Sequence, residues 1–318
     1  MNYCIGVDLG GANIAVGLVD LTEKKIIRRF SAKTNAPRPC EQISSDIVKI
    51  IGNLCSAEGI DLASLKWIGV ATPGIVKDGV VIRAGNLGWD NVDLAATMRS
   101  LTSLPCFVVN DANAAAYAEA TWGVGEGAGS LIALTLGTGV GGGIVLNGRM
   151  WEGINGFAAE IGHMVVDTDG RKCACGNRGC LEAYCSAPAI AFDARRVMKY
   201  HPESLLWKLC DGDADRMNAV IPFRAAERGD VAACEVIDKF MKYLAIGVSN
   251  LINLFQPDVV CIGGGISGEG DKLLLPLKER VSRISLGNGG KSTRIEIAKY
   301  MNNAGIIGSA LLGMSEEM

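Results

Sequence analysis

The amino-acid sequence predicts a mixed α/β fold built from two similar halves. Short apolar runs with strand character alternate with helical segments along the chain. The run IGVDLGGANIAVGLV, residues 5–19, has the same layout as IALTLGTGVGGGIVL, residues 132–146: a strand, a glycine turn and a second strand. This internal repeat indicates a duplicated domain.

The individual elements follow from apolar periodicity and from the residues that interrupt it. Strands are predicted at 3–7, 13–19, 25–30, 67–71, 106–109, 130–136, 141–146, 259–262 and 294–298, and helices at 41–55, 112–121, 272–284 and 304–313. We expect a small N-terminal α/β lobe at 1–120, with the C-terminal helix 303–318 as a candidate addition to it. A larger lobe at 121–302 would carry the cysteine-rich loop and nucleotide-binding elements.

Composition excludes several classes of function. The chain has 31 Lys and Arg against 34 Asp and Glu, and a net charge of −3 argues against sequence-independent nucleic-acid binding. The start of the chain has no charged leader, and no apolar run is long enough to span a bilayer. We therefore expect a cytoplasmic protein with no membrane partner. Isolated cysteines such as Cys4, Cys106 and Cys261 are then expected to be small core residues.

Three glycine clusters follow predicted strands: Gly10-Gly11, Gly137-Thr138-Gly139 and Gly263-Gly264-Gly265. Glycine lets backbone N–H groups approach phosphate oxygens, so these turns predict a nucleotide site, with the Thr138 hydroxyl as a further donor. Asp8, beside the first turn, could hold Mg²⁺ through water. A tight hairpin is the alternative for any single cluster. Three clusters at strand ends in a repeated framework favour the nucleotide site.

A carboxylate stands where a buried strand meets an alanine-rich helix, in the sequence Asn110-Asp111-Ala112. Phosphoryl transfer needs alignment, charge neutralisation and a carboxylate that accepts the proton of the attacking hydroxyl. Asp111 fits that requirement. An aspartate at this place can equally be an N-cap, and local sequence does not separate the two interpretations.

One histidine and three clustered cysteines form a predicted metal site. Their spacing is His163-x9-Cys173-x-Cys175-x4-Cys180, which matches a closed, tetrahedral Zn²⁺ set. A redox pair is the alternative, but the Cys173-x-Cys175 spacing departs from the usual two intervening residues. Cys185 is expected in the core, not as a fifth ligand.

Together these motifs resemble the ROK family of bacterial sugar kinases and repressors, and its glucokinases in particular. The resemblance covers nearly the whole chain in the expected order. It is carried by Asp8-Leu-Gly-Gly-Ala-Asn13, Thr72-Pro-Gly74, Asn86-Leu-Gly-Trp89, Asn110-Asp111, Leu136–Gly143, Glu160-Ile-Gly-His163, Cys180-Leu-Glu182 and Gly263–Gly265.

The resemblance implies a duplicated actin-like, ribonuclease-H-like fold with two lobes and a sugar site in the cleft between them. It implies that ATP phosphorylates the 6-hydroxyl of a hexose, with Asp111 as general base. It places the sugar against Gly74, Asn86, Asn110, Glu160, His163 and Glu182, and the nucleotide against Gly10, Gly11, Ala12, Asn13 and the other two glycine clusters. His163 would bind zinc through one ring nitrogen and face the sugar with the other.

Two positions depart from the family pattern, and several functions stay open. Ala12 stands where the family usually has threonine, and Ala159 where it commonly has glycine.

We expect glucose as the substrate, with N-acetylmannosamine, allose or fructose as alternatives. A sugar-responsive repressor would carry a DNA-binding segment ahead of these motifs, for which the first strand leaves no room. A non-catalytic sugar-binding protein is supported only by Ala12. The resemblance favours a homodimer.

Overall fold

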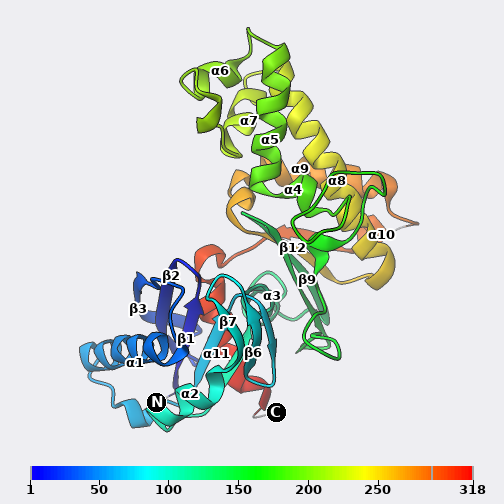
Figure 1. Cartoon of the computed structure of the whole chain (residues 1–318). Coiled ribbons are helices and arrows are strands. Elements are labelled where there is room, and N and C mark those ends of the chain that lie inside the picture. Colours follow the sequence, from blue (N-terminus) through cyan, green and yellow to red (C-terminus); the bar gives the residue numbers. More distant parts are fainter. Residues whose placement is uncertain (1, 288, 317–318) are drawn as a thin grey trace. The chain divides into compact units, whose positions relative to one another are not determined.

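The computed structural model describes residues 2–287 and 289–316, which fold into two compact units (Figure 1). The first unit comprises Met1–Gly127, Gly143–Ala159 and Lys299–Met318, and the second Ala128–Gly142 and Glu160–Ala298. The first unit therefore extends beyond residue 120. It also includes the segment 143–159, which sequence reasoning assigned to the second lobe.

The first unit contains a five-stranded sheet in the order β3-β2-β1-β4-β8. β1 is antiparallel to β2 and parallel to β4, and β4 is parallel to β8. Apolar side chains of β1 and of helix α1 share one core cluster on one face of the sheet. The strands are β1 Tyr3–Leu9, β2 Asn13–Asp20, β3 Lys25–Lys33, β4 Ile68–Thr72 and β8 Cys106–Asn110, and the first helices are α1 Cys40–Ala57, α2 Leu94–Thr102 and α3 Asp111–Thr121.

Helix α11, Ala304–Glu316, packs against β1, β4 and α3. Glycines allow this close approach. A Cβ at Gly6 would lie 1.9 Å from the Ile306 carbonyl oxygen, and one at Gly69 would lie 1.8 Å from the Ser309 carbonyl oxygen. These distances are far below van der Waals contact, so any side chain at either position would push α11 off the sheet.

The second unit repeats this topology. Its sheet has the order β11-β10-β9-β12-β13, in which β12 is parallel to both β9 and β13 and β10 is antiparallel to β11. The two sheets therefore share one connection pattern, which confirms the duplication predicted from the repeat. The strands are β9 Ser130–Leu136, β10 Val140–Leu146, β11 Arg149–Met150, β12 Val259–Gly263 and β13 Arg294–Ile297.

Sequence reasoning missed helix α2 and two larger parts of the fold. One is a small antiparallel sheet in the first unit, β5 Ile75–Lys77, β6 Val80–Ala84 and β7 Trp89–Asp93. The other is a helical block in the second unit. Its helices are α4 Glu182–Cys185, α5 Ala187–Val197, α6 Leu205–Leu209, α7 Val220–Ala226 and α8 Val231–Phe255. Later in the chain, α9 Asp271–Ile284 confirms the helix predicted at 272–284, and the short α10 Gly289–Ser292 follows it.

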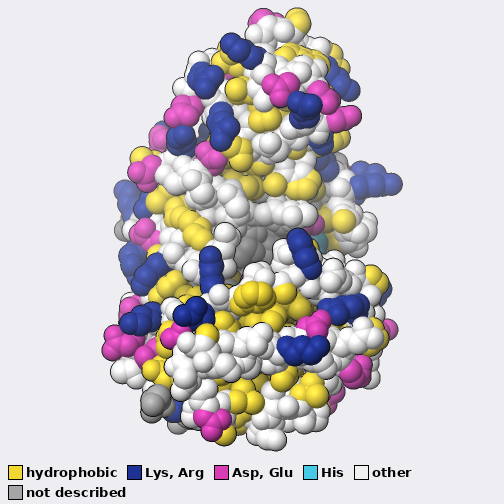
Figure 2. Space-filling model, turned by 90° about the vertical axis from the view of Figure 1, so that its left-hand side faces the viewer, with side chains coloured by type: hydrophobic (Ala, Val, Ile, Leu, Met, Phe, Trp, Pro, Cys, Tyr) yellow, Lys and Arg dark blue, Asp and Glu magenta, His cyan; other side chains and the backbone are white. Residues whose placement is uncertain are grey.

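The isolated cysteines and the surface charges can be located in the structure. Cys4, Cys106 and Cys261 are buried, as expected, and so is Cys185. On the face shown in Figure 2, lysine and arginine side chains are interspersed with aspartate and glutamate. Among the described residues, no helix is both long and apolar enough to cross a membrane.

Candidate active site

The first glycine turn, between β1 and β2, is held by hydrogen bonds within the turn and by Thr34, the residue that follows β3. The Gly10 N–H donates to the Asn13 carbonyl at 2.9 Å, and the Thr34 N–H donates to the Ala12 carbonyl at 3.0 Å. The hydroxyl of the fully buried Thr34 donates to the Gly10 carbonyl at 2.6 Å. Sequence reasoning missed Thr34, because it lies 24 residues from Gly10 and no local pattern connects the two. Ala12 and Asn13 are exposed at the turn.

Asp8 lies near the end of β1, two residues before this turn, and its side chain contacts the N-terminus of α11. A Cβ at Gly305 would sit 2.6 Å from the Asp8 carboxyl carbon, so the carboxylate is pressed against the first turn of that helix. Burial, and then the nearby charge of Asp111, raise the pKa of Asp8 to about 6. The two predicted carboxylates, 103 positions apart in sequence, are therefore close enough to influence each other's charge.

The strand-to-helix junction separates the roles of Asn110 and Asp111. Asn110 is the N-cap of α3: its side-chain oxygen accepts from the N–H groups of Ala112 and Asn113 at 2.9 and 3.2 Å. Its amide nitrogen donates to the Gly74 carbonyl at 2.9 Å. Asp111 is the first helical residue and is exposed, and its carboxylate accepts from the Ala112 N–H at 2.8 Å. The cap of α3 is thus provided by Asn110 and not by Asp111.

Gly74 and Asn86 flank these groups within the first unit. Gly74 has a φ of +92°, and a Cβ there would lie 2.1 Å from the Arg83 carbonyl oxygen, so only glycine fits. Asn86 packs against the first glycine turn, since a Cβ at Gly11 would lie 3.1 Å from the Asn86 Cβ. All the predicted site residues that precede residue 121 therefore belong to the first unit.

The second glycine turn, between β9 and β10, meets the third glycine cluster in the second unit. The Gly137 N–H donates to the Gly139 carbonyl at 2.9 Å, and Thr138 is exposed at the tip. Gly264 has a φ of +82°, and a Cβ there would lie 2.4 Å from the Leu136 carbonyl oxygen. Gly263 pairs with β9 at the end of β12, while Gly265 begins a short 3-10 helix and is exposed.

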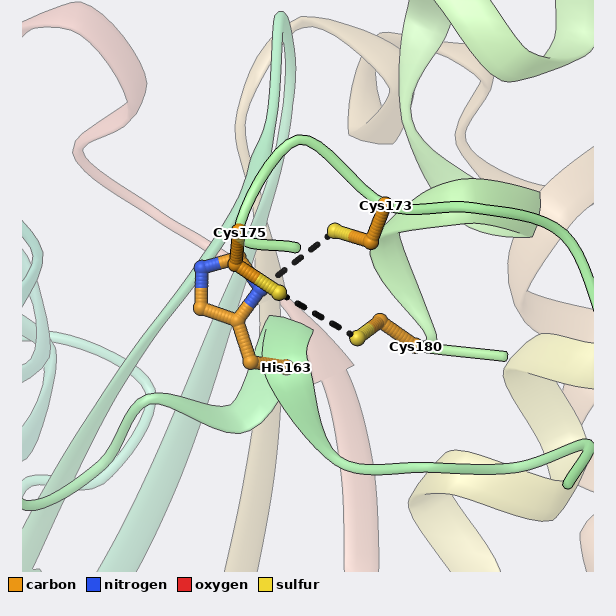
Figure 3. A group of neighbouring side chains, drawn as sticks. All are labelled: His163, Cys173, Cys175 and Cys180. Carbon is orange, nitrogen blue, oxygen red and sulfur yellow. Dashed lines mark hydrogen bonds between the residues drawn. The ribbon is translucent and has the colours of Figure 1, made fainter. Parts of the chain in front are cut away.

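The four predicted metal ligands converge (Figure 3). The His163 Nδ1 atom lies 3.7 Å from the Cys173 sulfur, and the sulfurs of Cys175 and Cys180 lie 3.6 Å apart. All four ligand atoms fall within 4.8 Å of one another. A tetrahedral Zn²⁺ with Zn–S bonds of about 2.3 Å places its sulfurs about 3.8 Å apart, so the residues fit such an ion.

The thiols of this cluster have unequal acidity in the absence of an ion. Burial, followed by hydrogen bonds with the other two thiols, raises the pKa of Cys180 to about 12. Burial also raises the pKa of Cys173, whereas a hydrogen bond from the Asn177 backbone lowers that of the exposed Cys175. Cys175 therefore has the most acidic thiol of the three.

The predicted sugar-binding residues of the second unit surround this cluster. The His163 Nε2 atom, on the opposite side of the ring from the cysteines, lies 3.9 Å from a carboxylate oxygen of Glu160. Glu182 accepts from the Cys173 thiol at 3.5 Å through one oxygen and from the Val140 N–H at 3.0 Å through the other. Glu182 therefore joins the cysteine cluster to the end of the second glycine turn, a link that the sequence did not reveal.

Comparisons with known proteins show the family to which the chain belongs. The model of the ROK family matches residues 4–316. A glucokinase from Halalkalibacterium halodurans is 36% identical over 319 residues, covering 99% of this chain and 96% of that protein. The chain belongs to the ROK family. A ROK family glucokinase from Streptomyces griseus, solved in complex with glucose and AMPPNP, is 34% identical, with a TM-score of 0.80, and the match covers 98% of this chain and 99% of that one.

ROK membership accounts for the duplicated topology, which is the two-lobed actin-like fold of ROK sugar kinases. The family also includes regulators: a xylose repressor from Bacillus subtilis is 28% identical, and the match covers 96% of this chain and 75% of the repressor. In this ROK chain the site residues form one group in each unit. Asp8, Ala12, Asn86, Asn110 and Asp111 belong to the first, and Glu160, His163, Glu182 and the cysteines to the second.

Proposed function

We propose that this ROK family sugar kinase is a glucokinase, which transfers the γ-phosphoryl group of ATP to the 6-hydroxyl of glucose. The observation that carries the proposal is the convergence of Glu160, His163 and Glu182 around one cysteine cluster. Two carboxylates and an imidazole nitrogen offer hydrogen bonds to neighbouring ring hydroxyls, as a hexose requires. Whole-chain similarity to glucokinases supports the choice of glucose.

Asp111 is the proposed general base. Its carboxylate is exposed at the start of α3, while Asn110 supplies the helix cap. In the reaction, Asp111 accepts the proton of the 6-hydroxyl as that oxygen forms a bond to the γ-phosphorus. The bond between this phosphorus and the bridging oxygen breaks, and ADP leaves with the electron pair. The second amide hydrogen of Asn110 is directed to a sugar oxygen in this proposal, since the first is donated to Gly74. Gly74 and Asn86 complete the sugar contacts from the first unit.

The glycine turns provide the nucleotide site in the same proposal. Backbone N–H groups of Gly10–Asn13, Gly137–Gly139 and Gly263–Gly265 would approach the nucleotide. Asp8 would hold Mg²⁺ through water, and that ion would neutralise phosphate charge. The methyl group of Ala12 donates no hydrogen bond, so in this proposal the first turn binds the nucleotide through backbone N–H groups and without a side-chain hydroxyl.

The proposed zinc site has a structural role. His163, Cys173, Cys175 and Cys180 supply four ligands, which leaves no open position for activating water. Coordination through Nδ1 would fix the ring of His163 with Nε2 directed toward the sugar and Glu160. The proposal also includes a homodimer, which the family resemblance favours, in the cytoplasm, which the composition of the sequence favours. Analytical ultracentrifugation tests the oligomeric state.

A coupled assay for ADP formation across glucose, fructose, allose, mannose, N-acetylglucosamine and N-acetylmannosamine tests the substrate. We expect the highest kcat/KM with glucose. If kcat/KM is higher with N-acetylmannosamine, allose or fructose than with glucose, that sugar is the substrate and the proposal of glucose is wrong. Calorimetric binding of a sugar without turnover of any would instead support the sugar-sensing alternative, for which the similarity to a xylose repressor is the supporting observation.

A further inference from the structure

A polar network beneath the cysteine-rich loop joins that loop to helices α4 and α8. Asp167 lies on the loop, between His163 and Cys173. One of its carboxylate oxygens accepts hydrogen bonds from the hydroxyls of Tyr184 on α4 and Tyr243 on α8, both at 2.9 Å. The hydrogen bond from Tyr184, and then the one from Tyr243, lowers the pKa of Asp167 below its usual range. One carboxylate thus connects three separate elements.

The two tyrosines are themselves fixed. Their rings stack with centroids 3.8 Å apart. The Tyr184 hydroxyl also accepts from the Arg171 N–H at 3.0 Å, and a Cβ at Gly170 would lie 2.3 Å from that hydroxyl. Each tyrosine can therefore hold only a narrow range of positions, and the loop closes around the hydroxyl of Tyr184.

A second carboxylate reinforces the first. Asp193 of α5 is buried and pairs with Arg171 of the loop and with Lys239 of α8, the latter at 3.2 Å. The Arg171 guanidinium lies over the Tyr184 ring, 5.1 Å from its centroid. The loop therefore contributes an anion and a cation to the same underlying helices, which restrains both its position and its rotation.

This network lies next to the two groups that the proposed function needs. Tyr184 is two residues from Glu182 on the single turn of α4, and Asp167 is four residues from His163. The loop and α4 meet again where the Cys173 thiol donates to Glu182. Any slip of the loop over α4 would separate His163 and the cysteines from Glu182.

We propose that Asp167, Tyr184 and Tyr243 form a clamp that positions Glu182 and His163 for the sugar and slows the release of zinc. The inference rests on the proposed function, because it takes both residues as sugar-binding groups. Asp167 and Tyr243 are positioning residues. They contact neither reacting atoms nor metal ligands, and they act by holding the loop against the helices that carry its partners.

The test compares Asp167→Ala, Asp167→Asn and Tyr243→Phe with the wild-type chain. Loss of a hydrogen bond to a charged group changes the equilibrium constant of a process that depends on this bond by about tenfold or more. We expect Asp167→Ala and Tyr243→Phe to raise the KM for glucose about tenfold, with kcat and the KM for ATP within about twofold of wild type. Asp167→Asn should restore part of the loss, because its amide oxygen can still accept from both hydroxyls.

The matched control is Asp230→Ala, at the N-terminus of the helix whose middle carries Tyr243. Asp230 caps α8 and accepts from Ser204 at 2.9 Å, Leu205 at 2.7 Å and Ala233 at 2.8 Å. It stands 13 positions before Tyr243, about 20 Å along the helix axis. This variant should lower Tm and leave the KM for glucose unchanged. An equal rise in the KM for glucose in the control, or an unchanged KM in both clamp variants, would overturn the positioning role.

Zinc release provides a readout that does not depend on activity. Metal is transferred from the purified protein to a coloured chelator, and the rate is compared among the same variants. Release should be several-fold faster in Asp167→Ala and Tyr243→Phe than in wild type and unchanged in Asp230→Ala. Equal rates in all four proteins would refute the clamp. If wild type phosphorylates no sugar, the proposed function fails separately, and these rates alone decide the clamp.

Discussion

Replacing Asp111 by asparagine tests the proposed general base with little disturbance of the fold. Asn110 already caps α3 through the Ala112 and Asn113 N–H groups, at 2.9 and 3.2 Å. An asparagine oxygen at position 111 can still accept from the Ala112 N–H. Removal of one negative charge from the first turn costs about 0.3–1 kcal/mol of helix–dipole stabilisation. Relief of the repulsion with Asp8 offsets part of that loss. Tm should therefore change by only a few degrees.

The catalytic effect should be much larger. General base catalysis contributes about 10²–10⁴-fold, so kcat should fall by that factor in Asp111→Asn. The affinity for glucose should stay within a few-fold of wild type, because Glu160, His163 and Glu182 are unchanged. Steady-state kinetics of ADP formation give kcat, and titration calorimetry gives the dissociation constant of glucose.

A contrasting variant strengthens the test. Asn110→Ala removes the cap of α3 and the hydrogen bond to Gly74, and loss of a cap costs about 1 kcal/mol. This variant should lower Tm and raise the KM for glucose while Asp111 still accepts the proton. If Asp111→Asn keeps more than about a tenth of the wild-type kcat, Asp111 is not the base.

Two further predictions concern acidity and metal. The pKa of Asp8 is raised from 3.8 to about 6, so between these values the folded chain binds a proton that the unfolded chain releases. The free energy of unfolding should therefore fall by roughly 2–3 kcal/mol as the pH rises from about 4 to 6 without nucleotide. Asp8→Asn should remove that part of the dependence, and an identical pH profile of Tm in the variant would contradict it. Wild type should bind about one zinc per chain by elemental analysis. Cys175→Ser should lose most of the zinc, whereas the exposed Cys234→Ser, outside the cluster, should keep it; equal zinc in both variants would rule out the four-residue site.

Much of the fold follows from local sequence. The strand–turn–strand repeat at residues 5–19 and 132–146 indicates the duplication, because each copy carries its own alternation of apolar residues and its own glycine turn. The three-stranded sheet and the helical block from α5 to α8 were not predicted. The strands of that sheet have only three to five residues, so their apolar alternation is too short to stand out. Helix α8, by contrast, buries Ala233, Val236, Phe240 and Leu244 along one face, so its helical periodicity was present in the sequence and was overlooked.

The sequence by itself determined which residues could do the chemistry. Cysteine spacing limits a metal site to His163, Cys173, Cys175 and Cys180, since one tight loop carries the three thiols, and the strand-to-helix junction presents Asn110 and Asp111 together. Only the tertiary structure decided how these residues divide their roles.

Asn110, not Asp111, caps α3, a choice that depends on backbone geometry. Burial, and then the charge of Asp111, raises the pKa of Asp8. Glu182 accepts a hydrogen bond from Val140, 42 positions away. Asp167 meets Tyr243, 76 positions away. Such contacts are set by the packing of distant segments, because electrostatic and hydrogen-bond energies depend on separation in space and not along the chain.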